Sequence, residues 1–157
     1  MKPSHCAALL VVGRMESERI PGFAAEWLTD GFDSPALRTL AGVESPIMSE
    51  VAPLFRKAMH EIGVDIPTKD EALMMLARDY AGRIIAGSLT AHAGAGLIWW
   101  HVTNEMERPN HLLLSFVGAA SELDDLEDRT AEDGADRQEY RRQLENQILE
   151  SARELLK

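Results

Sequence analysis

The sequence has little cysteine and no long hydrophobic run, and both absences limit what the protein can be. Its one cysteine, Cys6, has no second cysteine with which to form an internal disulfide or a cysteine-based zinc site. The longest apolar run near the start, Cys6 to Val12, has seven residues. A membrane-spanning helix needs about 20, and a secretory signal needs a longer apolar core with a cleavage site. We therefore expect a cytoplasmic protein with no membrane attachment.

Basic residues are scarce relative to acidic ones. Sixteen Lys and Arg side chains stand against 26 Asp and Glu, which gives a formal net charge of −10. Nucleic-acid backbones and anionic membranes attract basic surfaces, so we expect neither of them as a partner. The charge instead suits a basic protein partner, although acidity also serves simple solubility.

The sequence also lacks the short signatures of common catalytic and cofactor-binding sites. It contains no G-x-S-x-G elbow and no phosphate-binding loop. Gly94-Ala95-Gly96 has neither the third glycine nor the preceding strand of a dinucleotide fingerprint. The five histidines form no H-x-x-x-H pair. We therefore predict no cofactor, no metal site and no catalytic residue, and interpret the protein as a non-enzyme.

The sequence is rich in residues that favour helix. The 157 residues are 45% hydrophobic and 27% charged, which is typical of one globular domain with its own core. Much of the apolar content is Ala, Leu, Ile and Met, which favour helix. The prediction is an all-α fold, a compact single domain over residues 1–157 built as an array of six or seven helices. Residues 1–16 fit a docked tail, a short strand or a helix turn.

Capping residues and hydrophobic periodicity indicate where the helices lie. The clearest start is the capping box Thr68-Lys69-Asp70-Glu71, in which the Thr68 hydroxyl and the Glu71 carboxylate satisfy each other's backbone donors. Ser34-Pro35 and Ser45-Pro46 predict two more starts, although Pro53 means that the second of these helices either kinks or begins near Val51. The glycines at 94 and 96 predict a loop before a short helix or strand. The predicted helices span about residues 21–30, 34–42, 45–63, 68–86, 97–102, 111–129 and 136–156.

The most unusual local feature is an acidic segment over residues 122–139. Nine carboxylates there stand against two arginines, a net charge of −7 out of the total of −10. We predict that acidic side chains of this segment, together with a tandem tryptophan pair, contact a protein partner. The predicted partner-binding residues are Glu122, Asp124, Asp125, Glu127, Asp128, Glu132, Asp133, Trp99 and Trp100.

Part of the acidic segment allows a second interpretation. The run from Asp124 to Asp128 resembles the D-D-x-x-D motif of isoprenoid synthases, and carboxylates at these spacings on a helix converge on Mg²⁺ ions. The alternative hypothesis is therefore a small metal-dependent hydrolase that uses Glu122, Asp124, Asp125 and Asp128. The resemblance covers five residues and no second Asp-rich motif exists. A solvated helix end is thus the simpler interpretation.

The tandem Trp99-Trp100 also allows two interpretations. Neighbouring side chains on a helix point about 100° apart, so the two indoles need not enter one core. Two partly buried core tryptophans are the commoner arrangement. The alternative leaves one indole exposed, and an exposed tryptophan is a favoured binding anchor.

The stretch from Trp27 to Gly42, with Gly31-Phe32-Asp33-Ser34-Pro35 at its centre, resembles a motif of small uncharacterised bacterial proteins. The resemblance implies no activity. The residues themselves indicate a helix, a tight corner and a short helix capped by Asp33 or Ser34, with Arg38 placed to pair with Asp33 or Asp30.

These observations lead to three functional hypotheses. The leading one is a non-enzymatic protein-binding module, in its most specific form an immunity- or antitoxin-like protein that neutralises a basic toxin. The metal-dependent hydrolase is the second. The third is a self-associating structural protein, a homo-oligomer joined through the last helix. Its motivation is the narrow apolar stripe Tyr140, Leu144, Ile148 and Leu155.

Overall fold

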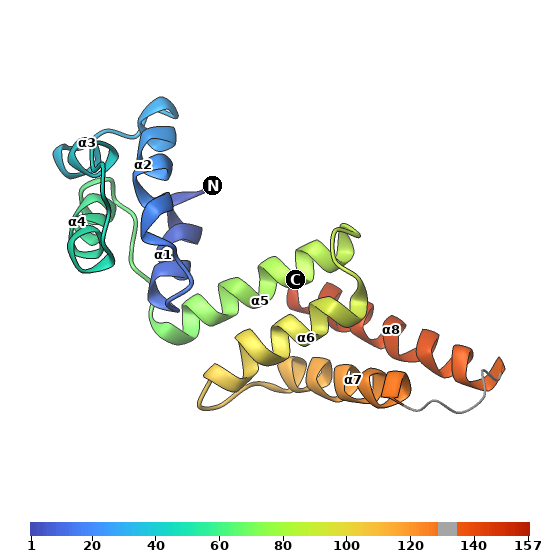
Figure 1. Cartoon of the computed structure of the whole chain (residues 1–157). Helices are drawn as coiled ribbons and strands as arrows, with labels where there is room; N and C mark the ends of the chain where they lie inside the picture. The colour runs from blue at the N-terminus through green and yellow to red at the C-terminus, as the bar shows by residue number, and fades with distance from the viewer. Residues whose placement is uncertain (129–134) are drawn as a thin grey trace. The chain divides into compact units, whose positions relative to one another are not determined.

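The computed structural model describes residues 1–128 and 135–157, and within them it contains eight α-helices and no strand (Figure 1). The all-α prediction is confirmed, with slightly more helices than the six or seven expected. The contacts within the chain divide it into two compact units, Met1–Ala72 and Leu73–Lys157. The expected single domain over the whole chain stays a prediction. None of the described helices is both long and apolar enough to cross a membrane.

The first unit has a hydrophobic core of its own, with Trp27 in it. Its helices are α1 (Pro3–Val11), α2 (Ile20–Thr29), α3 (Pro35–Ala41) and α4 (Met48–Glu61), with a 3₁₀ turn at Ser17–Arg19. The Trp27 side chain is fully buried and meets Phe55 edge-on at a centroid distance of 6.0 Å. Other large, fully buried side chains of this core are Ile20, Leu37, Leu40 and Met59.

The segment that the sequence leaves open at the start of the chain is a helix. α1 buries Cys6, Ala7 and Leu10 in the core. Pro3 occupies its first turn, where a missing N–H costs no helical hydrogen bond. Gly13 follows with a φ of +67°, which glycine adopts without steric cost. Of the alternatives for this segment, the apolar run from Cys6 therefore packs as a helix and not as a short strand.

The corner between α2 and α3 has the form that the sequence predicts. The Leu37 N–H donates to the Ser34 hydroxyl oxygen at 3.1 Å, so Ser34 is the cap of α3. Arg38 pairs with Asp33, its Nε donating to Oδ1 at 2.8 Å. Of the alternatives that the sequence leaves open, Ser34 and not Asp33 is the cap, and Asp33 and not Asp30 pairs with Arg38.

α4 begins later than the sequence predicts. It starts at Met48, after Ile47 in an extended conformation, and no side chain caps its first turn. Ile47 stands at the capping position, so Ser45, two residues earlier, is not the cap. The helix runs through Pro53, and the alternative start near Val51 is therefore wrong.

The second unit contains the rest of α5 (Lys69–Ile85), inside which the boundary between the units falls. It continues with α6 (Ala91–His101), a 3₁₀ turn at Thr103–Glu105, α7 (His111–Asp128) and α8 (Ala135–Leu155). α7 packs against both α6 and α8 (Figure 1). The capping box of α5 is confirmed, because the Thr68 N–H donates to Glu71 Oε2 at 2.8 Å and the Glu71 N–H donates to Thr68 Oγ1 at 3.4 Å. The large buried side chains of the second unit are Leu73, Ile98, Leu113, Phe116, Leu123 and Ile148.

The prediction of a loop before residue 97 is wrong, because α6 already begins at Ala91. Thr90 caps it, its hydroxyl oxygen accepting a hydrogen bond from the Ala93 N–H at 3.2 Å. Gly94 lies against α5, since a Cβ at this position would be 2.3 Å from Ile84 Cγ1. This glycine therefore marks a close helix–helix contact and not a break in the helix.

The apolar stripe of α8 is covered within the second unit. Leu144, Ile148 and Leu155 are buried, whereas Tyr140 is exposed. The hydroxyls of Ser115 on α7 and Ser151 on α8 are 2.8 Å apart, which adds a polar link between the two helices. The stripe therefore no longer argues for a second chain.

Candidate functional site

Part of the predicted acidic site lies on the last two turns of α7, and its described members are here called the acidic cluster: Glu122, Asp124, Asp125 and Glu127. The side chain of Asp128, and the predicted Glu132 and Asp133, lie outside the described residues. Negative charges at a helix C-terminus are repelled by the partial negative charge of the helix end and by one another. The cluster therefore gains stability from any cation or hydrogen-bond donor placed beside it.

Neighbouring helices supply such groups. His92 on α6 lies between two carboxylates, with Nε2 2.7 Å from Asp124 Oδ1 and Nδ1 3.5 Å from Glu127 Oε1. Arg141 on α8 also pairs with Glu127, at 3.1 Å. The sequence shows no carboxylate partner for His92, because Asp124 lies 32 residues away along the chain. The packing of α6 on α7 brings them together.

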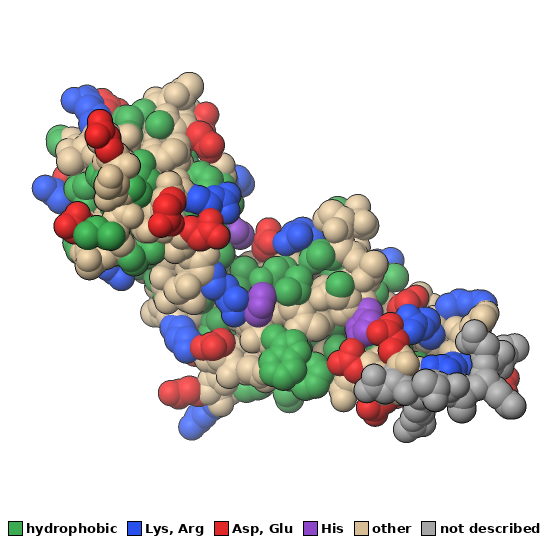
Figure 2. Space-filling model, in the orientation of Figure 1, with side chains coloured by type: hydrophobic (Ala, Val, Ile, Leu, Met, Phe, Trp, Pro, Cys, Tyr) green, Lys and Arg blue, Asp and Glu red, His purple; other side chains and the backbone are tan. Residues whose placement is uncertain are grey.

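The acidic cluster stays accessible despite these contacts. The side chains of Asp124 and Glu127 keep 57% and 52% of their surface exposed, and exposed ion pairs contribute only about 0–1 kcal/mol each. The Tyr140 hydroxyl donates to Glu122, and Asp125 forms no ion pair within the described part of the chain. Acidic and basic side chains lie side by side at this end of α7 and α8 in Figure 2. The carboxylates of Asp124 and Glu127 therefore remain largely open to solvent.

The acidic cluster does not form a metal site as far as residues 1–128 and 135–157 show. No group of three or more His, Cys, Asp or Glu side chains in them is placed to hold an ion. His92 meets Asp124 and Glu127 through opposite ring nitrogens, so these three groups cannot converge on one cation. Asp125 instead lines a hollow of about 320 Å³ beside Tyr140. The contacts of this region thus give the hydrolase hypothesis no support.

Trp99 and Trp100, at the end of α6, form an exposed aromatic surface. Their rings stack with centroids 5.1 Å apart and planes 18° from parallel. Trp100 is 62% exposed and Trp99 is half-buried. These two residues are here called the tryptophan patch, and hydrophobic side chains gather on the surface of α6 and α7 in Figure 2.

The tryptophan patch rests on a well-packed helix end. Ile98 and Val102, on either side of the pair, have no exposed surface. Next to the pair, His101 Nδ1 is 2.8 Å from the Tyr80 hydroxyl on α5. The patch is therefore presented on a fixed base.

The acidic cluster and the tryptophan patch lie at opposite ends of α6. His92, which contacts the cluster, precedes Trp99 by seven residues, close to two helical turns, so both lie on one side of α6 about 10 Å apart along its axis. They are two separate features rather than one site. A standard protein interface buries about 800 Å² per partner, a patch roughly 30 Å across, and is large enough to include both.

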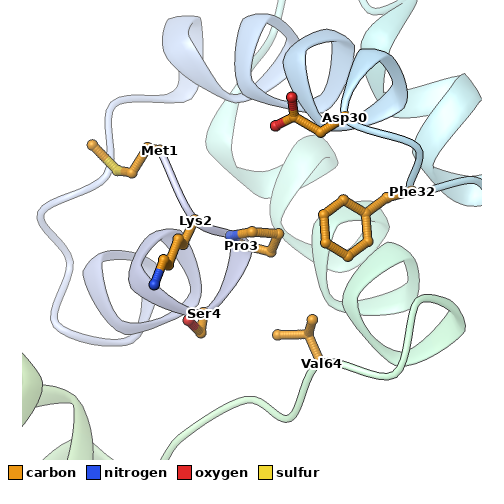
Figure 3. A pocket seen from close by; sticks show the side chains of 7 residues that line it. All are labelled: Met1, Lys2, Pro3, Ser4, Asp30, Phe32 and Val64. Atoms are coloured by element: carbon orange, nitrogen blue, oxygen red, sulfur yellow. The ribbon is translucent and has the colours of Figure 1, made fainter.

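The first unit contains a pocket that the sequence does not reveal. Its volume is about 560 Å³, within the range of about 300–1,000 Å³ typical of ligand pockets. Its walls come from the start of the chain, the α2–α3 corner and the segment after α4, so no single motif describes it. The one sequence feature that points to it is the corner at Phe32. The lining residues are Met1, Lys2, Pro3, Ser4, Asp30, Phe32 and Val64 (Figure 3).

No protein family, curated protein or solved structure matches this chain. Its function therefore has to be inferred from its own surface features, which are the acidic cluster, the tryptophan patch and the pocket.

Proposed function

We propose that this chain is a protein-binding module without catalytic activity, and that the tryptophan patch is its main contact with the partner. The observation that carries the proposal is the exposure of Trp100, which leaves 62% of its surface in water. A large aromatic side chain gains hydrophobic free energy when a partner covers it. Tryptophan is accordingly among the residues most often found as binding hot spots.

The stacking of the two indoles supports this role. Trp99 and Trp100 restrict each other's rotamers, so little side-chain entropy remains to be lost when a partner binds. The buried Ile98 and Val102 hold the backbone beneath them. Rigid aromatic anchors of this kind provide contact area at a low entropic cost.

The charge of the surface supports a basic partner. Lys and Arg side chains pair with carboxylates and also stack on the faces of tryptophan rings. One basic surface can therefore meet the acidic cluster and Trp100 together, and opposite charges speed association. The most specific form of the proposal is an immunity- or antitoxin-like protein that neutralises a basic toxin.

The test is affinity capture from a lysate of the native host, with the bound proteins identified by mass. We expect one basic protein in stoichiometric amount, released at high salt. Trp100→Ala should weaken its binding by about tenfold or more, as expected for a hot spot. Ile47→Ala removes a side chain of similar exposure, 55%, from the first unit and should leave binding unchanged.

The contribution of charge is tested separately. Asp124→Asn combined with Asp125→Asn should slow association and reduce its dependence on salt. Equal capture by Trp100→Ala and the wild-type chain would show that the patch is not the contact. Failure of the wild-type chain to retain any protein would count against the proposal as a whole.

A further inference from the structure

His92 on α6 faces a carboxylate at each of its two ring nitrogens. Nε2 lies 2.7 Å from Asp124 Oδ1, and Nδ1 lies 3.5 Å from Glu127 Oε1. Both carboxylates belong to α7, so this one side chain joins the start of α6 to the end of α7. The His92 side chain keeps only 22% of its surface exposed. The ring is thus enclosed by the contact, while the two carboxylates remain largely open to solvent.

The two contacts require different protonation states of the ring. A neutral imidazole donates a hydrogen bond from one nitrogen and carries a lone pair on the other, whereas an imidazolium donates from both. The shorter contact, to Asp124, is the one that a neutral ring keeps. The lone pair of Nδ1 then faces the Glu127 carboxylate and repels it. Histidine ordinarily changes its charge between about pH 5 and 8, so the contact with Glu127 depends on pH.

Glu127 has a second partner to which it can turn. Arg141 Nη2 on α8 lies 3.1 Å from the same oxygen, Oε1, and a guanidinium keeps its charge throughout this pH range. Arg141 and Arg137 also line a hollow of about 290 Å³ together with Glu127. Loss of the His92 contact therefore leaves Glu127 beside basic side chains of α8.

The charged groups that face His92 come from α7, and Arg141 of α8 reaches one of them. Among residues 1–128 and 135–157, the ion pairs of His92 are those to Asp124 and Glu127. The sequence of α6 contains no Asp, Glu, Lys or Arg, and its second histidine, His101, lies at the opposite end of the helix. α5 meets α6 beside Gly94 through the side chain of Ile84, which is apolar.

We propose that His92 is a pH-dependent clasp on the acidic cluster. The protonated ring holds Asp124 and Glu127 together against α6, and the neutral ring keeps Asp124 and releases Glu127. Release removes one positive charge from the cluster and leaves Glu127 with one partner fewer, so basic groups bind more tightly above the histidine range than below it. By linkage, a bound basic group favours the neutral ring. The clasp is a property of the chain alone, whereas its effect on binding rests on the proposed function.

The clasp is tested by NMR of the ¹⁵N-labelled full chain, through the ring N–H protons of His92. A ring N–H is observed when a hydrogen bond protects it from exchange with water. We expect two such signals at about pH 5.5 and one, that of Nε2, at about pH 8. Glu127→Ala should remove the Nδ1 signal alone, and Asp124→Ala should remove the Nε2 signal alone.

The effect on binding is tested with a hexa-arginine peptide as the basic probe, titrated into the chain at constant ionic strength. The wild type should bind it about three- to fivefold more weakly at about pH 5.5 than at about pH 8, the effect of one exposed ion pair. His92→Gln, which cannot change its charge, should bind it equally at both. His111→Gln, which removes an exposed histidine from the other end of α7, is the matched control and should keep the wild-type pH dependence.

The two parts of the proposal fail in different ways. The same His92 ring signals at both pH values, or no Nδ1 signal at the lower one, would overturn the clasp. Two signals that become one, together with equal hexa-arginine binding at both pH values, would overturn the control of binding while the clasp stands. If the peptide binds at neither pH, the proposed affinity for basic groups is contradicted, and the ring signals still decide whether the clasp exists.

Discussion

The structure leaves no room for a side chain at Gly94. A Cβ there would lie 2.3 Å from Ile84 Cγ1 and 2.5 Å from its Cδ1. We predict that Gly94→Ala destabilises the chain by about 1–3 kcal/mol, the usual effect of overpacking a core contact. Urea denaturation followed by circular dichroism measures the change.

Gly96 provides the matched control two residues later in the same helix. A Cβ there would meet nothing within 4 Å, and alanine is a better helix former than glycine by about 1 kcal/mol. Gly96→Ala should therefore leave stability unchanged or raise it. Equal stability of the two variants would mean that α5 and α6 do not approach as closely as described.

His92 and Trp100 show what single residues reveal before the structure is known. The sequence presents His92 without a carboxylate partner, and packing brings Asp124 to 2.7 Å from it. For Trp100 the sequence allows both burial and exposure, and in the structure the side chain is exposed. Chemical types are thus readable from the sequence, whereas their partners depend on contacts between distant segments.

At the scale of helices, Glu61 joins the end of α4 to the start of α3. Its carboxylate accepts the Ala36 N–H at 2.9 Å, and this hydrogen bond, with a smaller contribution from the Ser34 hydroxyl, holds the pKa of Glu61 below its ordinary value. A folded-state pKa below the unfolded one means that the ionised form stabilises the fold. That contribution is present above the unfolded pKa and is lost as the pH falls through the folded one.

We therefore predict that Glu61→Gln lowers the melting temperature by a few degrees at neutral pH. The difference from the wild type should shrink as the pH falls through the acidic range, because the wild-type carboxylate is then protonated as well. Thermal melts at several pH values measure it, with Glu44→Gln as the control. A difference that is the same at every pH would show that ionisation of Glu61 is not its cause.

The helices themselves are largely predictable from local sequence. The capping box at Thr68 and the cap at Ser34 lie where the residues indicate, because caps depend on neighbours within one turn. The start of α6 is mispredicted for the opposite reason. Gly94 weakens the local helix signal but is required by Ile84 on another helix, and only tertiary contact shows that requirement.

At the scale of the whole chain, the three tryptophans divide between the two units. Trp27 belongs to the first, and Trp99 and Trp100 belong to the second. Replacing the latter two with Phe leaves a chain in which tryptophan fluorescence reports on the first unit alone. If residues 1–157 fold as the single domain that the sequence predicts, urea curves from fluorescence and from far-UV circular dichroism of this variant will coincide. Two separated transitions would show units that unfold independently.

The candidate site is less predictable than the fold at this scale. The acidic segment is visible in the sequence as a composition, but the cluster that the structure describes is smaller and is already contacted by His92 and Arg141. The sequence marks the corner at Phe32 but does not reveal the pocket, since the walls of the pocket come from three separate segments. The contacts of the acidic cluster and the walls of the pocket both depend on packing between residues far apart along the chain.

The stacking of Trp99 on Trp100 also has an optical consequence. Two indoles 5.1 Å apart with nearly parallel planes are close enough for their electronic transitions to couple. The circular dichroism of this protein should therefore contain an exciton couplet superimposed on the helix spectrum, and helix contents fitted without it will be biased. A partner that wedges between the rings would abolish the couplet, whereas one that only covers them would preserve it, so this band distinguishes two modes of docking without any added label.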